Sequence, residues 1–344
     1  NTMYKIPLSV PSLKGNEWQY VKECIETEWV SSAGKYVDLF EQKIAEYTGS
    51  KYAIACVNGT AALQVSLRLA GVGAGDEVLM GTLTFIASVN AITYNNAKPI
   101  FMDADKYYNI DAEKTIKFIK NETVFKNGFT YNKKTNNKIT AIIPVHVWGN
   151  ACWLDELIEL CNKQNIAIVE DACESLGTFY NNGKYEGKHA GTIGKLGCLS
   201  FNGNKIITTG GGGMIMTDNE EMAKKAYYLT NQAKDDPVHY IHHEIGYNFR
   251  LTNIQAALGL AQLETLSKYI KKKKIIHERY KNKINKIEGL AISNAPYFAS
   301  CNYWLNILEI RKYLSKGKLS KIIKYLSKNS IETRPIWYPN HLQK

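Results

Sequence analysis

The chain has 344 residues, of which 45% are hydrophobic and 22% charged, and its formal net charge is +11. This composition is typical of a globular protein with a large core, and the length favours one large domain followed by a smaller one. No apolar run reaches the roughly 18 residues that a membrane span needs, and no basic-then-apolar leader is present, so neither membrane insertion nor export is predicted.

Cysteine usage and charge give two further expectations. The seven cysteines form no CxxC pair, and their odd number and apolar neighbours favour reduced thiols in a cytoplasmic protein. The excess of lysine lies late, at 268–274 and 311–328. It fits either a solvated helix face or the attraction of an anionic substrate such as a nucleotide diphosphate. Nucleic-acid binding is not expected, because no zinc-finger spacing or aromatic RNA-binding motif accompanies the lysines.

Strand and helix patterns alternate along the first 231 residues, which predicts an α/β sheet covered by helices. The expected strands are 51–56, 77–80, 99–102, 140–145, 166–169, 196–201 and 214–217. The expected helices are 61–70, 85–94, 112–120, 153–164 and 219–231.

The rest of the chain has a different pattern. Residues 233–247 form a polar segment without periodicity, which is a candidate active-site or interface loop. One long helix is predicted from 253 to about 286. A strand (303–310), a helix (319–326) and an extended segment (331–337) then predict a small α+β unit. We therefore expect a large domain with an N-terminal arm (1–252), a connecting helix (253–289) and a small C-terminal domain (290–344).

Lys205 is the most informative residue of the chain. It lies among Ser, Asn, Thr and Gly, 34 residues after Asp171, which follows the apolar strand 166–169. This pair suits pyridoxal 5′-phosphate (PLP): a lysine amine forms a Schiff base with the cofactor aldehyde, and a carboxylate keeps the pyridine nitrogen protonated. The glycines that follow the lysine are neither a Walker loop nor a dinucleotide fingerprint. Neither His146 nor the pair His242-His243 has metal-ligand spacing, so no metal site is expected.

Two positions are candidates for holding a phosphate. Asn58-Gly59-Thr60 joins a strand to a helix, where backbone N–H groups and the Thr60 hydroxyl suit an anion. The alternative is an ordinary turn with Asn58 as helix cap. Ser200 precedes Lys205 by five residues and could also reach the phosphate, or it could simply end its strand.

Phe85 and Glu174 are candidates for contacting the cofactor ring. Phe85 follows a turn at a helix start, where an aromatic side chain could cover a planar ring; core packing is the alternative. Glu174 follows Asp171 by three residues and could reach the same ligand, although such an acid is more often solvated.

These residues resemble the sugar aminotransferases of the DegT/DnrJ/EryC1 family, along nearly the whole chain from Pro7 to His341. The resemblance implies the type I PLP fold, with a mixed, mostly parallel seven-stranded sheet. The sequence blocks that carry it are Trp29-Val30-Ser31-Ser32, Asn58-Gly59-Thr60-Ala61-Ala62-Leu63, Thr84-Phe85, Pro144-Val145-His146, Glu170-Asp171-Ala172, Ser200 through Lys205 to Gly213, Gly246-Tyr247-Asn248-Phe249-Arg250 and Asn253-Ile254-Gln255-Ala256-Ala257.

The resemblance also implies roles by position. Lys205 is the Schiff-base lysine, Asp171 is the partner of the pyridine nitrogen, and Glu174 lies beside the phenolic oxygen. Gly59, Thr60 and Ser200 hold the phosphate, and Phe85 covers the ring. Asn248 reaches the phosphate site of a neighbouring subunit, so the active unit is a homodimer.

The substrate is inferred from the resemblance alone. The blocks around Pro7, Lys205 and Lys234 are most similar to the branch that aminates UDP-linked 4-keto-6-deoxy-N-acetylhexosamines for bacillosamine or legionaminic acid, with L-glutamate as amino donor. Alternatives are a GDP- or dTDP-linked keto sugar aminated at C3 or C4, a PLP-dependent dehydratase, or a regulatory nucleic-acid-binding protein. Lys205 argues against the dehydratases, which have histidine there.

Two features depart from the family pattern. Many relatives have Gln or His at the position of Glu174, and a carboxylate beside a phenolate favours one shared proton. Relatives also extend by about another helix past the position of Lys344, which leaves the C-terminal substrate contacts open.

Overall fold

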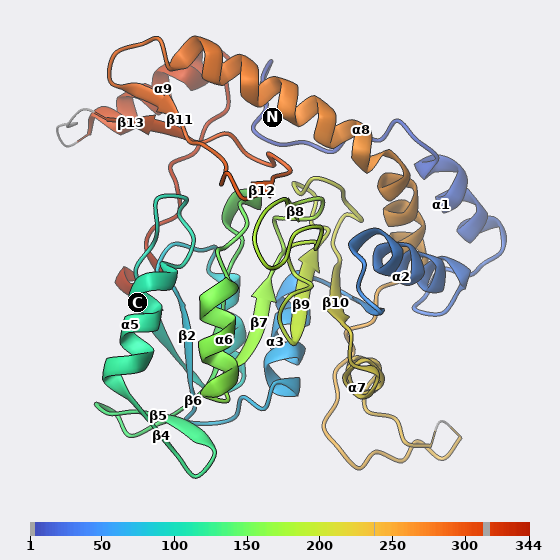
Figure 1. The fold of residues 1–344 in the computed structure, drawn as a ribbon. Coiled ribbons are helices and arrows are strands. Elements are labelled where there is room, and N and C mark those ends of the chain that lie inside the picture. The colour runs from blue at the N-terminus through green and yellow to red at the C-terminus, as the bar shows by residue number, and fades with distance from the viewer. Residues whose placement is uncertain (1–3, 237, 312–316) are drawn as a thin grey trace.

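A computed structural model describes residues 4–236, 238–311 and 317–344. Residue 237 of the expected polar loop and residues 312–316 of the second lysine-rich stretch therefore lie outside the described residues. Among those described, no helix has the length and apolar character needed to cross a membrane. Figure 1 shows a central twisted sheet, with helices on both faces and the long helix α8 running across one side of the molecule.

The central sheet is the mixed, mostly parallel sheet that the sequence predicts. Seven strands follow one another in the order β1-β10-β9-β7-β6-β2-β3, and β10 alone runs antiparallel to its two neighbours in this row. Their bounds are β1 Tyr52–Cys56, β2 Glu77–Gly81, β3 Lys98–Met102, β6 Lys138–Ile143, β7 Ala167–Asp171, β9 Leu196–Ser200 and β10 Gly213–Thr217.

The sheet has nine strands rather than seven, because a hairpin is attached to β6. This hairpin consists of β4 (Thr123–Lys126) and β5 (Phe129–Asn132), and β5 pairs with the start of β6. Its two-residue turn is Asn127-Gly128, and both residues have positive φ (52° and 79°). Such a turn matches the twist of antiparallel strands, so the Asn-Gly pair was a hairpin signal that the sequence analysis missed.

Successive side chains of each strand point to opposite faces of the sheet and pack against the helices on both faces. In β7, Val169 packs into the cluster beneath α3 (Gly59–Leu69), α4 (Ala87–Tyr94) and α7 (Glu220–Thr230), whereas Ile168 packs beneath α5 (Ala112–Glu122) and α6 (Asp155–Lys163). In β10, Ile215 faces the first cluster, and Met214 packs towards α2 (Lys35–Thr48) and α8 (Asn253–Ile284). Successive strand side chains point to opposite faces, so each strand serves both layers.

Helix α8 leads from the sheet to the C-terminal part. A capping box starts it: the Thr252 side chain accepts from the Gln255 N–H, and the Gln255 side chain accepts from the Thr252 N–H. After α8, β11 (Leu290–Ile292) pairs with β13 (Leu308–Ile310), β12 (Ala299–Ser300) pairs with β8 (Phe179–Tyr180) of the large part, and α9 spans Lys318–Lys328. The division of the chain at residues 252 and 289 stays a prediction.

Several expected elements differ in the structure. The strand expected at 303–310 is limited to Leu308–Ile310, because Asn302 and Trp304 turn inward to other partners. The extended segment 331–337 makes one bridge, from Ile331 to Ile6 of the N-terminal arm, and contains Pro335, which has no N–H for a ladder. Helix α4 begins at Ala87, which leaves Phe85 in the preceding turn. Helices α1 (Glu17–Glu26) and α2 were not predicted.

Candidate active site

A pocket of about 290 Å³ opens at the carboxyl edge of the sheet. Strands β1, β7 and β9 all end there, because β1 and β9 both pair antiparallel with β10 and β7 runs parallel to β9. Ligands of open α/β sheets bind at this edge. Seven of the eight predicted site residues line the pocket, namely Gly59, Thr60, Phe85, Asp171, Glu174, Ser200 and Lys205.

Lys205 lies in the loop between β9 and β10. Its backbone N–H donates to the carbonyl of Asn202 (3.0 Å), which folds the loop back over the strand end. The side-chain Nζ lies 3.6 Å from Glu174 Oε1 and 4.3 Å from the centroid of the Trp304 ring. The lysine amine therefore faces the pocket with one carboxylate and one aromatic face around it.

Asp171 ends β7, and both of its carboxylate oxygens are held. Oδ2 accepts from the Ser88 hydroxyl (2.5 Å), and Oδ1 accepts from the backbone N–H of Cys173 (3.1 Å). Asp171 is buried, which strengthens its interaction with any cation in the pocket. The arrangement fixes the direction of the carboxylate and suits a ligand with a protonated ring nitrogen.

Glu174 is not the solvated acid of the alternative interpretation, because its side chain is buried next to Lys205. Its Oε2 accepts from the backbone N–H of Trp148 (2.6 Å). Burial raises the pKa of Glu174 to about 7, although Lys205 and the Trp148 N–H act in the opposite direction. Near neutral pH this carboxyl is consequently poised to hold or release a proton inside the pocket.

The part of the pocket lining formed by the start of α3 fits an anion. Asn58 caps α3: its side chain accepts from the Ala61 N–H (2.8 Å) and its carbonyl from the Ala62 N–H (3.1 Å). The N–H groups of Gly59 and Thr60, at the positive end of the helix, are then left for a ligand. A Cβ at Gly59 would lie 2.8 Å from Cys173 Sγ and 2.9 Å from the Ser200 Cβ, so only glycine leaves this cradle open.

Phe85 lines one wall of the pocket, and its side chain is not buried in the hydrophobic core. Its side chain is 54% exposed, and its ring lies 6.1 Å from that of Trp337, which comes from the C-terminal segment. An aromatic side chain that is exposed at a pocket wall can cover a planar ligand. Core packing, the alternative interpretation, is therefore wrong for Phe85.

Asn248 is the predicted site residue that the structure does not bring to this pocket. It is exposed, follows the 233–247 loop, and forms a backbone bridge to Asn231. The Arg68 guanidinium anchors that loop by donating to the Ile245 carbonyl (2.7 Å) and to Glu244 (2.8 Å). A contact of Asn248 with a second subunit stays a prediction.

Sequence reasoning missed several residues that line or support the pocket. Ser88 lies in the first turn of α4 and donates to Asp171, which is 83 residues later in the chain, so no local pattern marks it. Trp304 and Trp337 come from the C-terminal part, more than 90 residues after Lys205, and no local motif marks them. Trp148 contributes only its backbone N–H, which no side-chain pattern can reveal.

The amino-acid sequence matches the family described as DegT/DnrJ/EryC1/StrS aminotransferases over residues 11–344. The chain belongs to this family. It is 38% identical over 340 residues to the putative pyridoxal phosphate-dependent aminotransferase EpsN of Bacillus subtilis (strain 168), covering 98% of this chain and 83% of that protein. It is 39% identical over 339 residues to the GDP-perosamine synthase of Escherichia coli O157:H7, covering 98% of this chain and 86% of the other.

Solved structures of the family share the fold. A DegT/DnrJ/EryC1/StrS aminotransferase from Brucella abortus superposes with a TM-score of 0.84 at 26% identity, covering 95% of this chain and 82% of that one. The PLP form of the putative sugar aminotransferase Spr1654 from Streptococcus pneumoniae gives a TM-score of 0.85 at 24% identity, covering 99% of this chain and 86% of the other. The cofactor is pyridoxal 5′-phosphate, and the pocket fits it with a lysine, an ionisable acid and an anion cradle around one cavity.

Proposed function

We propose that this aminotransferase moves an amino group from L-glutamate to the ketone of a nucleotide-linked 4-keto-6-deoxy sugar. The observation that carries the proposal is the convergence of Lys205, Asp171 and Glu174 on one pocket that ends in an anion cradle. Bound PLP supplies an electron sink that stabilises negative charge next to its ring. The proposed product is an amino sugar for a surface glycan, a role supported by a 32% identical relative named spore coat polysaccharide biosynthesis protein SpsC.

Each pocket residue has a task in this proposal. Lys205 would hold the cofactor through its Nζ, and its free amine would carry a proton between the donor Cα and the cofactor C4′. Asp171, oriented by Ser88, keeps the ring nitrogen protonated. Glu174 shares a proton with the phenolic oxygen, a role that suits a pKa of about 7. Gly59, Thr60 and Ser200 bind the phosphate, and Phe85 covers the ring.

The sequence blocks and the named relatives favour different nucleotides on the substrate. The sequence blocks around Pro7, Lys205 and Lys234 favour a UDP-linked N-acetylhexosamine of the bacillosamine or legionaminic acid type. Three relatives at 36–39% identity are named GDP-perosamine synthase, which favours a GDP-linked sugar. A panel of UDP-, GDP- and dTDP-linked keto sugars, assayed with glutamate, distinguishes them by kcat/KM. If the enzyme turns over none of these sugars, the proposed substrate class is wrong.

Lys205→Ala tests the catalytic assignment. The variant should still bind PLP through the phosphate cradle, but it should form no borohydride-stable adduct and turnover should collapse. Peptide mapping of the reduced parent protein identifies the modified lysine. An adduct on any other lysine contradicts the assignment. If the parent protein is instead colourless and binds DNA in a salt-sensitive way, it behaves as a nucleic-acid-binding protein and the enzyme assignment is wrong.

We further propose a homodimer in which Asn248 reaches the phosphate bound in the neighbouring subunit. The exposed position of Asn248, away from the pocket of its own chain, supports this arrangement. Asn248→Ala should weaken PLP binding about 10- to 150-fold, because a hydrogen bond to a charged group contributes roughly 1.5–3 kcal/mol. A fully active monomer, or unchanged PLP affinity in the variant, contradicts the shared site. A cytoplasmic location is part of the same proposal, supported by seven free thiols.

A further inference from the structure

The catalytic lysine has a neighbour that belongs to neither its loop nor the sheet. The indole of Trp304, from the segment between β12 and β13, lies over Lys205 Nζ, 4.3 Å from the ring centroid. This distance is well within the roughly 6 Å over which a cation is attracted to an aromatic face. Trp304 is 4% exposed and the Lys205 side chain 12%, so both partners are largely removed from bulk water at the pocket wall.

Trp304 also holds the main chain that carries the lysine. Its Nε1–H donates to the carbonyl of Asn204 (2.7 Å), the residue before Lys205, and the Ser9 hydroxyl of the N-terminal arm donates to the same carbonyl (2.7 Å). The indole therefore restrains Lys205 twice, through its backbone and at the tip of its side chain. Holding a lysine side chain in one position costs conformational entropy. Because Trp304 already restrains Lys205, less entropy is lost when the lysine takes up its catalytic geometry.

The position of Trp304 is itself fixed by a buried asparagine. Asn302 Oδ1 accepts from the Trp304 N–H (2.9 Å), and Asn302 Nδ2 donates to the carbonyls of Glu174 (2.8 Å) and Leu176 (3.0 Å). The same side chain thus anchors both neighbours of the lysine amine, Glu174 and Trp304. Gly149 makes room for it: a Cβ at this residue, whose φ is +91°, would lie 2.0 Å from Asn302 Oδ1.

We propose that Trp304 is a positioning residue for Lys205, and that its indole face keeps the lysine nitrogen beside Glu174 both in the cofactor-free protein and when PLP is bound. A neutral aromatic face attracts the protonated amine but offers no proton acceptor, so it places the amine without competing for the proton that the amine must transfer. The inference rests on the proposed catalytic role of Lys205. The other titratable groups around Nζ are Glu174, Asp171 and the Cys173 thiol.

Two substitutions separate the ring face from the hydrogen bond. Trp304→Phe keeps an aromatic face and loses the donor to Asn204, and Trp304→Leu loses both. Trp153→Leu is the matched control, because Trp153 packs against Phe298 (4.9 Å) and donates to Glu156 (2.5 Å) outside the pocket. Thermal unfolding of all three variants checks that they fold.

The readouts are the rate at which cofactor-free protein takes up PLP and the midpoint pH at which the PLP-loaded protein changes colour. In Trp304→Leu we expect uptake to slow about 2- to 30-fold and the midpoint to fall by about 0.4–1.5 pH units, the range of a cation–π contact. Trp304→Phe should stay within about threefold of the parent, and Trp153→Leu should match it. The inference is overturned by an unchanged midpoint in Trp304→Leu, or by equal effects of the Phe and Leu substitutions.

The outcome is separable from that of the proposed function. Borohydride mapping of the parent protein is done first. An adduct on another lysine overturns the role of Lys205 and this inference with it. An adduct on Lys205 together with an unmoved midpoint in Trp304→Leu overturns the role of Trp304 alone.

Discussion

Glu170 lies in β7 and Glu174 lies three residues after the end of that strand, and the two carboxyl groups have opposite surroundings. Glu170 is fully buried and faces a cluster of donors behind the pocket, whereas Glu174 is buried inside the pocket beside Lys205. The pKa of Glu170 is lowered and that of Glu174 is raised to about 7. Burial alone therefore does not decide the protonation state of a carboxyl group; the number of donors that it meets does.

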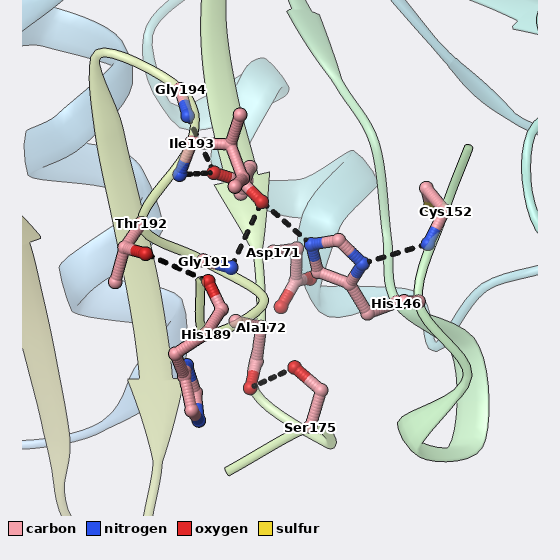
Figure 2. Close-up of polar contacts among 12 residues, drawn as sticks. His146, Cys152, Asp171, Ala172, Ser175, His189, Gly191, Thr192, Ile193 and Gly194 are labelled. Atoms are coloured by element: carbon pink, nitrogen blue, oxygen red, sulfur yellow. Dashed lines mark hydrogen bonds and ion pairs between the residues drawn. The ribbon is translucent and has the colours of Figure 1, made fainter. Parts of the chain in front are cut away.

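Four donors meet the Glu170 carboxylate, from His146, Gly191, Ile193 and Gly194, which are labelled in Figure 2. His146 Nε2 donates to Glu170 (2.8 Å), while His146 Nδ1 accepts from the Cys152 N–H (3.0 Å), which fixes the tautomer. The backbone N–H groups of Gly191 (2.8 Å), Ile193 (2.6 Å) and Gly194 (2.5 Å) donate to the two carboxylate oxygens. Burial raises the pKa of Glu170, but these donors outweigh it and keep the carboxylate ionised.

The pocket side offers fewer donors. Glu174 accepts from one backbone N–H and lies 3.6 Å from the Lys205 amine. An incompletely satisfied buried carboxyl costs stability, and it is retained where it can exchange a proton with a ligand. We therefore expect changes at Glu170 to affect folding and changes around Glu174 to affect chemistry and pH dependence.

The largest effect is expected at Glu170. Glu170→Ala leaves four buried or half-buried donors without their acceptor, and the free energy of unfolding should fall by about 3–5 kcal/mol. Urea unfolding of cofactor-free protein measures it, with Glu159→Ala as a control at an exposed ion pair with Lys184 that should change by at most about 1 kcal/mol. Equal effects of the two substitutions contradict a structural role for Glu170.

The pH dependence of stability should differ between the parent and Glu174→Gln. Between pH 4.5 and 7 the folded state keeps a proton on Glu174 that the unfolded state has lost, so this residue makes stability fall as pH rises through that window. Gln does not titrate, and the variant should therefore gain up to about 3 kcal/mol relative to the parent between pH 4.5 and 8. Unfolding at both pH values measures it. Parallel curves for the two proteins contradict a protonated Glu174.

Turnover should depend strongly on the charge of Asp171. Asp171→Asn keeps one acceptor oxygen for the Cys173 N–H, and its amide NH2 can donate to the Ser88 hydroxyl oxygen, but it removes the negative charge opposite the ring nitrogen. We expect at least ~100-fold lower kcat, the scale of a lost catalytic electrostatic contact. Far-UV circular dichroism and PLP binding should show a folded, loaded protein. Activity within a few-fold of the parent would make Asp171 a structural residue, like Glu170.

The smallest effect is expected at Ser88. Ser88→Ala removes one of the two donors that orient Asp171, and kcat should fall about 2- to 10-fold, since a hydrogen bond contributes roughly 0.5–1.5 kcal/mol. If Ser88 acts through Asp171, the same substitution should lose less activity in the Asp171→Asn background. Additive losses in this double-mutant cycle would assign Ser88 a separate role.

Much of the sheet and its covering helices, between residues 52 and 230, could be predicted because short local patterns in the sequence mark these elements. Apolar runs of about five residues, separated by helical periodicity, locate the strands of the main row, and the Asn58 cap locates α3. Motifs at strand ends meet at one edge once the strands are parallel, so Asp171, Ser200 and Gly59 could be expected together. The hairpin at 123–132 was missed because each of its strands has only four residues, which is too short for a clear alternation of apolar and polar side chains.

The seven strands of the main row, the candidate lysine and the family could be predicted from the sequence, because short patterns encode strand periodicity, helix caps and strand-end motifs. The surroundings of the lysine and of its two acids depend on tertiary contacts. The Trp304 face lies over Lys205, the Ser88 hydroxyl donates to Asp171 and the Trp148 N–H donates to Glu174, and these three residues come from segments far apart in the chain. The same holds for protonation. Glu170 and Glu174 are the same residue type in one short segment. Their pKa values separate because long-range contacts bring four donors to Glu170, but only one backbone N–H and the Lys205 amine to Glu174. Hydrogen-bond partners at such separations leave no local pattern to predict them.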